Sequence, residues 1–482
     1  MKQFAYCTLI NTFLLFFISG VFAFPLFPDQ EGWSGIYFKG RKLGFSRYSL
    51  KNLSESIEIK SKVFFRINVA GLEQSTSFSQ KTILKKNLEP KSFYLLQEVM
   101  GTRHQTQGKL ENNCLILTIS TKGFKKNKTL PFKKNSALSS SLLLKVLTRG
   151  LKIGKRGNLP VFMEAFRSYS NANFQILGKE TLNIQGIDEE AFVIRQNIGG
   201  LEVRTWITRE GKVLKEISAD GFESFLETKE KAQEMDNNII SASNLITLSV
   251  IRPQKVIRFP FSQKTLKVKL SNLLGPKSIP QDQRQKILKT ETLEDKTFSL
   301  VLMIRSEAEK HLFNKHLPKK ILEPKFLEET AEIQHNHPLI KALLNKIVKK
   351  DWSPWRKALE INDWVYRNLD KVLEDSVSAL DALQKRKGEC QSHTNLFVAL
   401  ARAAGMPARV INGLVYSIEF KGFAYHAWPE VYIDQWGWRA FDPTLGQSVA
   451  DATHIKLAEG NETGSLKLLE FIGKLKIQIL ED

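Results

Sequence analysis

Three side chains near the end of the chain have the types and the order that a thiol nucleophile requires. They are Cys390, His426 and Asp442, and they lie within one short stretch of the sequence. A thiol attacks only as its thiolate, and a free cysteine titrates about 1.5 units above neutral pH, so it needs a nearby base. An imidazole supplies that base, and a carboxylate orients the imidazole. These residue types therefore predict a nucleophile, a base and a base-orienting carboxylate.

The elements around the three residues are predicted to bring them together. Cys390 begins a predicted helix that ends near Ala404, so its sulfur lies beside the partial positive charge of a helix N-terminus, which favours the thiolate. His426 falls near the start of a predicted strand, and the turn Gln435-Trp-Gly437 leads to the next strand, which carries Asp442. Strand–turn–strand geometry then places the carboxylate alongside the imidazole.

Hydrophobic periodicity in this part of the chain changes from helix to strand. Apolar residues recur at helical spacing before Cys390, and Ser353-Pro354 is a typical helix start. Strand-like runs follow Pro407. Helices followed by antiparallel strands form an α+β arrangement. We predict helices over residues 338–349, 354–369, 378–387 and 390–404, and strands over residues 408–416, 425–433 and 438–441.

The chain before these helices is predicted to be mainly β-structure. From Trp33 to Glu227, apolar and polar residues alternate between short turns, with a hairpin at Lys39-Gly-Arg41 and an antiparallel meander over residues 181–218. The charged stretch Phe225 to Met235 is predicted to be a short helix. A second β-rich segment runs from about Leu245 to Ser306.

Length and composition indicate several globular domains. At 482 residues the chain is too long for one ordinary core, and 42% hydrophobic with 25% charged residues is typical of globular proteins. We predict a signal peptide over residues 1–23, a β-rich N-terminal domain over 24–240, a second β-rich domain and linker over 241–335, and a catalytic domain over 336–482.

The first residues have the pattern of a secretory signal. Lys2 precedes a mostly apolar run from Leu9 to Phe22, and Val21-Phe-Ala23 is a plausible cleavage site. The run is shorter than the ~20 residues that span a bilayer, and no second run is long enough. The mature protein is therefore expected to be exported, to be periplasmic or extracellular, and not to be an integral membrane protein.

Cleavage near Ala23 would remove Cys7 and leave two cysteines. Cys114 lies in a strand-like run and is predicted to be buried as a small hydrophobic residue. Two cysteines are too few for a disulfide framework, and a bond between them would abolish the Cys390 nucleophile.

The formal net charge of +21 is the outlier of the composition. A basic chain is drawn to anionic surfaces, and an anionic cell-envelope surface is a candidate partner, although scattered surface lysines give the same charge without a partner. No nucleic-acid-binding motif accompanies the charge, so a nucleic-acid partner is not expected.

Three motifs in this region resemble the transglutaminase-like superfamily. They begin at Gly388-Glu-Cys-Gln-Ser-His-Thr-Asn395, at His426-Ala-Trp-Pro-Glu-Val-Tyr432 and at Gly437-Trp-Arg-Ala-Phe-Asp-Pro-Thr444, in that family's order. The resemblance covers roughly Ala358 to Gln447. It implies a papain-like core of helices packed on an antiparallel sheet, here preceded by mainly β domains.

The resemblance implies a Cys-His-Asp triad of Cys390, His426 and Asp442. No cofactor is predicted, and the sequence leaves a calcium requirement open. Such a triad attacks the amide carbonyl of a protein or peptide substrate and forms a thioester. An exported member with β domains before the core suggests hydrolysis, as in a peptidase or amidase, more than cross-linking. The backbone N–H of Cys390 is a candidate oxyanion donor. Gln391 and Trp428 are further candidates for oxyanion or substrate contacts.

Two other functions stay open at this point. One is a non-catalytic cell-envelope binding module that retains the fold, and the other is a cell-wall amidase drawn to anionic polymer by the positive charge. No metal site is predicted, because His335 and His337 lack accompanying carboxylates or thiols and are expected in a surface loop. His393 could line the site, pack in the core or contact solvent, and His454 is predicted to be structural.

Overall fold

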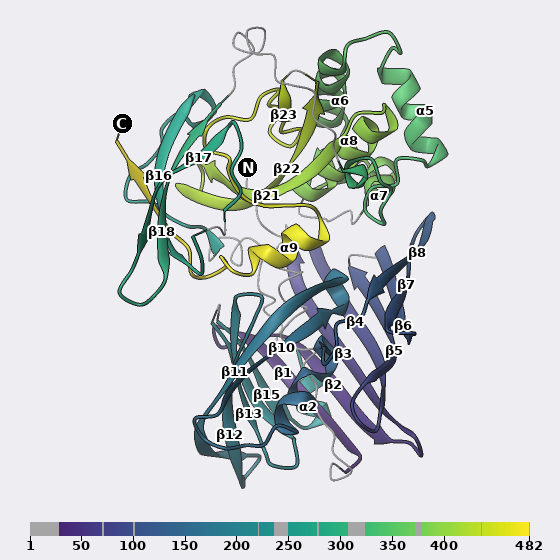
Figure 1. The fold of residues 1–482 in the computed structure, drawn as a ribbon, viewed down its shortest axis with the longest axis vertical. Helices are drawn as coiled ribbons and strands as arrows, with labels where there is room; N and C mark the ends of the chain where they lie inside the picture. The colour runs from purple at the N-terminus through teal and green to yellow at the C-terminus, as the bar shows by residue number, and fades with distance from the viewer. Residues whose placement is uncertain are drawn as a thin grey trace. The chain divides into compact units, whose positions relative to one another are not determined.

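The chain is mostly β-structure, and the longer helices among its described residues lie between residues 338 and 403 (Figure 1). The structure is a computed structural model, and it describes residues 28–69, 72–99, 102–219, 221–235, 249–276, 279–306, 323–372, 378–434 and 436–481. These residues form two compact units, one before residue 242 and one from residue 242 onward. The predicted signal peptide lies outside the described residues.

The first unit contains a 15-stranded sheet. Its first eight strands form one antiparallel meander, and the later strands continue from the pairing of β1 with β15. The strands are β1 (Gln30–Phe38), β2 (Arg41–Asn52), β3 (Ser56–Val69), β4 (Leu72–Lys85), β5 (Pro90–Val99), β6 (Thr102–Glu111), β7 (Cys114–Thr121), β8 (Phe124–Pro131), β9 (Ala137–Leu138), β10 (Arg156–Met163), β11 (Ser168–Ile184), β12 (Ile187–Ile198), β13 (Leu201–Ile207), β14 (Val213–Ser218) and β15 (Phe222–Glu227), with helices α2 (Leu142–Leu147) and α3 (Lys229–Gln233).

Local patterns in this unit predicted part of its strands correctly. The hairpin turn at Lys39 and Gly40 and the meander over residues 181–218 are confirmed. The helix predicted from Phe225 to Met235 is shorter, because residues 222–227 pair with β1 and only α3 is helical. Cys114 lies in a strand as predicted but is half-buried, since the inward positions of β7 are Leu115, Leu117 and Ile119.

A smaller sheet in the second unit is built from distant parts of the chain. Its strand order is β17 (Gln285–Thr292), β18 (Phe298–Arg305), β16 (Thr265–Leu273) and β25 (Lys476–Leu480). In Figure 1 the C-terminal strand runs beside β16, and Lys267 is paired with Leu480. The sheet thus takes a strand from beyond the segment 241–335 predicted for it. The three-part division of the mature chain stays a prediction.

The remainder of the second unit holds the helices and a second four-stranded sheet. The helices are α5 (Pro338–Ile347), α6 (Pro354–Asn368), α7 (Ala379–Lys385), α8 (Cys390–Ala403) and α9 (Glu462–Leu468). The sheet order is β23 (Gly437–Ala440), β22 (Gly422–Ile433), β21 (Ala408–Ser417) and β24 (Ile455–Glu459), and the short strands β19 (Asp370–Lys371) and β20 (Lys387–Gly388) pair in parallel.

Helix α8 is the centre of this core. Leu396, Phe397 and Leu400 on α8 are completely buried in one cluster with residues of α5, α6, β21 and β22. The predicted starts of α6 and α7 are confirmed, because Ser353 and Ser378 cap them through their side chains. Among the described residues, no helix is long and apolar enough to cross a membrane.

Candidate active site

Cys390 is the first residue of α8. Its side chain is only 4% exposed, and it follows the short strand β20. The first N–H groups of a helix have no partner within that helix, and together with the helix dipole they place partial positive charge at this end. Burial opposes a thiolate, so ionisation of Cys390 requires this field and a nearby base that becomes a cation when it takes the thiol proton.

His426 and Asp442 form a buried pair. Nε2 of His426 lies 2.8 Å from Oδ2 of Asp442, and neither side chain is exposed to solvent. His426 lies within β22, and Asp442 comes two residues after the end of β23, the neighbouring strand. The predicted strand–turn–strand arrangement therefore brings imidazole and carboxylate together. Because this contact uses Nε2, the opposite ring nitrogen, Nδ1, is the one that would serve a nucleophile.

The carboxylate of Asp442 is held by four donors. Its Oδ1 accepts from the backbone N–H groups of Thr444 and Leu445, at 2.8 and 3.0 Å. Burial opposes its ionisation, but the charges and hydrogen bonds of His426 and His454 outweigh burial and hold the pKa of Asp442 well below its usual range. Asp442 is therefore ionised and accepts hydrogen bonds only, so the proton shared with His426 resides on Nε2.

His454 is the site residue that the sequence did not reveal. Its Nε2 lies 2.9 Å from the same Oδ2 of Asp442, and its Nδ1 lies 3.3 Å from Oδ1 of Asp451. Burial opposes protonation, but Asp451 and Asp442 outweigh it and raise the pKa of His454 to about 8. The available signal was an aspartate and a histidine three residues apart, just before a strand.

Metal-ligand atoms of His426, Asp442 and His454 lie within 4.8 Å of one another. Nε2 of each imidazole already contacts Oδ2 of Asp442 at a hydrogen-bond distance, and a cation bound between these atoms would have to replace both hydrogen bonds. The geometry is therefore that of a hydrogen-bonded chain of three side chains.

Comparison with known protein families identifies the segment that carries this geometry. The family model of the transglutaminase-like superfamily matches residues 341–443, which include Cys390, His426 and Asp442 but not His454. Residues 341–443 are a transglutaminase-like domain. The resemblance found in the three motifs is confirmed.

Similarity to individual proteins is more remote. An uncharacterised protein of Haemophilus influenzae is 27% identical over 183 residues, which are 33% of this chain and 48% of that protein, so the chain spans about half of its length. A candidate cysteine protease from Cytophaga hutchinsonii aligns with a TM-score of 0.30 at 18% identity, covering 44% of this chain and 83% of the other. A β-barrel-like protein from Brucella abortus aligns with a TM-score of 0.35 at 10% identity, covering 42% and 96%.

Trp428 packs against His426 of the transglutaminase-like domain and against His454. Its ring is stacked on His426 with centroids 6.2 Å apart and meets His454 edge-on at 5.2 Å, and it is completely buried. Its indole N–H has no hydrogen-bond partner among the described residues. These contacts support the two imidazole rings, and the predicted oxyanion or substrate contact of Trp428 stays a prediction.

Gln391 and His393, which follow Cys390, differ in their surroundings. Nε2 of Gln391 donates to Oδ1 of Asn395 at 2.9 Å and to Oδ1 of Asn461 at 3.1 Å, so its amide hydrogens are engaged within the protein. Its predicted oxyanion role stays a prediction. His393 is completely buried between the carbonyls of Glu389 and Leu369, and burial lowers its pKa. Of the three roles left open for His393, the structure supports packing in the core and excludes solvent contact.

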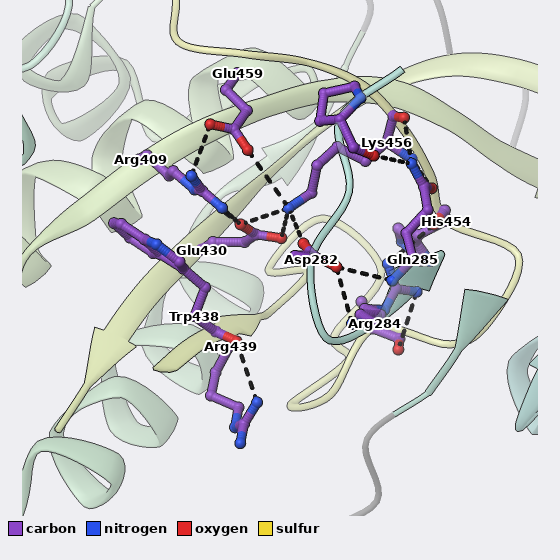
Figure 2. A network of polar contacts seen from close by, with 12 residues as sticks. Asp282, Arg284, Gln285, Arg409, Glu430, Trp438, Arg439, His454, Lys456 and Glu459 are labelled. Carbon is purple, nitrogen blue, oxygen red and sulfur yellow. Dashed lines mark hydrogen bonds and ion pairs between the residues drawn. The ribbon is translucent and has the colours of Figure 1, made fainter. Parts of the chain in front are cut away.

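A buried ion-pair network is centred on Glu430 (Figure 2). Glu430 comes four residues after His426 in β22, so the two side chains point to the same face of the sheet. Glu430 binds Arg409 at 2.8 Å and Lys456 at 2.7 Å. Lys456 also pairs with Asp282, which precedes β17 in the smaller sheet. The guanidinium of Arg409 lies 4.0 Å from the ring centroid of Trp438. The network ties strands β21, β22 and β24 to the smaller sheet.

Proposed function

We propose that the chain is a cysteine-dependent acyl-transfer enzyme whose nucleophile is Cys390, with His426 as base and Asp442 as the group that orients the base. The observation that carries the proposal is the 2.8 Å contact between His426 and Asp442, in a domain that places Cys390 at the start of α8. The buried face of α8 against an antiparallel sheet supports a papain-like α+β core.

The first half of the reaction forms the thioester. Nδ1 of His426 takes the proton of the Cys390 thiol, and the thiolate attacks the carbonyl carbon of an amide. The oxygen of the tetrahedral intermediate carries the negative charge, and the backbone N–H of Cys390 is the donor that we propose for it. As the C–N bond breaks, the imidazolium returns its proton to the departing nitrogen, which leaves as an amine.

The second half resolves the thioester. Water attacks the thioester carbonyl while His426 takes a proton from it. The C–S bond then breaks, which regenerates the Cys390 thiolate and releases the carboxylic acid. A primary amine in place of water gives a new amide. We propose hydrolysis of a protein or peptide substrate as the main outcome, because the sequence region before the core has the β-rich texture expected of an exported peptidase or amidase.

Export and an envelope partner belong to the same proposal. The apolar run ending near Ala23 supports export, and the formal charge of +21 supports attraction to an anionic envelope surface. A net positive chain with a thiol site would then meet its peptide substrate at that surface.

Covalent capture tests this function. Incubation of the protein with a cell-envelope extract and acid quenching should leave an acyl group on Cys390, detected by peptide mass spectrometry, and should release new carboxyl ends in H₂¹⁸O that carry ¹⁸O. Cys390→Ala should yield neither. Addition of a labelled primary amine separates the two fates, since label in place of ¹⁸O would contradict hydrolysis. Equal products from the wild type and Cys390→Ala would contradict the enzyme assignment.

A further inference from the structure

A buried chain of side chains extends beyond the three residues of the proposed triad. Oδ2 of Asp442 accepts hydrogen bonds from two imidazoles, from Nε2 of His426 at 2.8 Å and from Nε2 of His454 at 2.9 Å. His454 in turn reaches Asp451 through Nδ1. His426, Asp442 and His454 are all completely buried. The family match ends at residue 443, so Asp451 and His454 lie outside the matched segment.

We propose that His454 is a positioning residue of the Cys390 site. His454 holds the carboxylate of Asp442 in place as the hydrogen-bond acceptor of His426. Asp451 and residues of the smaller β-sheet in turn hold His454. The proposal rests on the proposed function of Cys390. It assigns a role to the segment 447–454 and to the residues before β17 that contact it.

Charge in the buried cluster supports this role. Asp442 and Asp451 both have lowered pKa values, so two carboxylates are ionised in a region without solvent. A protonated His454 donates to both and leaves one net negative charge facing His426, which matches the single positive charge of an imidazolium there. Without that proton the two buried carboxylates would keep their other hydrogen-bond donors but lose the positive charge between them, and that loss is costly in a low-dielectric interior.

Asp451 is fixed by its own segment. Its Oδ1 accepts from the backbone N–H and the hydroxyl of Thr453 at 2.7 and 2.6 Å, and its Oδ2 accepts from Gln447 at 2.7 Å. Gln447 also forms a backbone bridge with Asp442. The two aspartates are thus connected both through His454 and through the backbone between them.

The smaller sheet fixes the position of His454. Arg284, buried just before β17, donates to the carbonyls of His454 and Asp451, the former at 2.9 Å (Figure 2). The side-chain amide of Gln285 donates to the backbone carbonyl of Lys456 and accepts from its backbone N–H, both at 2.9 Å. The charged side chains in contact with His454 or its backbone include Asp442, Asp451, Arg284 and, when protonated, His426. Lys371 in addition interacts electrostatically with Asp442.

The pH dependence of Cys390 alkylation by iodoacetamide tests the proposal without a substrate. His454→Gln keeps an N–H for Asp442 but cannot carry the charge, and His454→Phe keeps only a ring against Trp428. In a Cys114→Ser background, each variant should shift the acidic midpoint of alkylation to higher pH by one unit or more, because Asp442 then takes up a proton more readily. The wild type should show an inflection near pH 8 that both variants lack. His337→Gln, which removes the cap of α5, is the matched control and should keep the wild-type profile.

Three results would overturn the proposal. The first is a folded His454→Gln or His454→Phe protein with the wild-type midpoint and inflection. The second is one-to-one Zn²⁺ binding by the wild type that His454→Gln abolishes, since the cluster would then be a metal site. If neither variant folds, ¹⁵N NMR of the histidine rings in the wild type decides: a doubly protonated His454 at pH 7 supports the proposal, and a neutral ring contradicts it. Failure of the proposed function differs from all three, because wild-type Cys390 would then titrate like a free thiol.

Discussion

The rings of Phe397 and Phe441 pack with their centroids 5.4 Å apart, and this contact joins the helix that begins at Cys390 to the residue before Asp442. Both rings are completely buried, and Trp355 of α6 packs on Phe441 at 5.3 Å. The nucleophile and the orienting carboxylate are therefore carried by segments that share one hydrophobic core.

Truncation of Phe441 should weaken both the fold and the site. Phe441→Ala leaves a cavity between α8 and the segment that carries Asp442, and we expect it to lower the free energy of unfolding by about 3–5 kcal/mol. Urea unfolding of the purified protein measures this loss. Phe441→Leu retains most of the buried volume and should cost less. Equal stability of the alanine variant and the wild type would show that this contact does not hold the two segments together.

Gly413 is required where β21 passes Trp428 and β24. It is paired with His426, and a Cβ there would lie 2.1 Å from the carbonyl oxygen of Ile455 and 2.6 Å from the Trp428 ring. Gly413→Ala should therefore force the strands apart and destabilise the protein by roughly 1–3 kcal/mol, measured as a lower urea midpoint. Gly178→Ala, whose Cβ meets nothing within 4 Å, is the control. A stable Gly413→Ala protein would contradict the close approach.

Stability should depend on the proton of His454. Its pKa in the folded protein, about 8, lies above its ordinary value of 6.5, so the folded state binds this proton more tightly than the unfolded chain. The resulting stabilisation is fully present below about pH 6.5 and is lost as the pH rises through 8, and it amounts to roughly 2 kcal/mol. Urea unfolding at pH 6 and pH 9 should show this loss in the wild type. His454→Gln should show a smaller difference between the two pH values, and an unchanged difference would refute the assignment.

Local periodicity was sufficient for helices α5 to α8 and for strands β21 to β23, but not for α9 or β24. Helices α5 to α8 have an apolar face and clear start signals, so their predicted bounds differ from the observed ones by a few residues at most. The same holds for β21 to β23. Strand β17 was missed because it is an edge strand whose residues are mostly exposed, which leaves little alternation to detect.

Long-range pairing could not be predicted from the same patterns. Strand β25 pairs with β16 across about two hundred residues of chain, and nothing in either segment specifies the other. The contact between His454 and Asp442 was missed for a related reason. It depends on how the segment 447–454 folds back, and that path is set by the buried contacts of Arg284 and Gln285 from the smaller sheet.

Arg284 should control the order of that segment. Arg284→Lys keeps the charge but has one donor nitrogen, which cannot reach the separate carbonyls of Asp451 and His454. Hydrogen bonds to charged groups contribute about 1.5–3 kcal/mol, so amide hydrogen exchange over residues 451–454 should rise by about tenfold or more. Lys286→Met, at an exposed position of β17, is the matched control. Unchanged exchange in Arg284→Lys would contradict the role given to the smaller sheet.

The most direct test of the account is the pH at which Cys390 becomes reactive. In a Cys114→Ser protein, alkylation of Cys390 by iodoacetamide should have its midpoint below about pH 7, because an imidazolium and a helix N-terminus lower thiol pKa values from about 8.5 to 3.5–7.5. The midpoint is the readout, since limited access to a buried sulfur changes the rate but not the titration. His426→Ala should return the midpoint to that of a free thiol. A wild-type midpoint near pH 8.5 that His426→Ala leaves unchanged would contradict the assignment of Cys390 as an activated nucleophile.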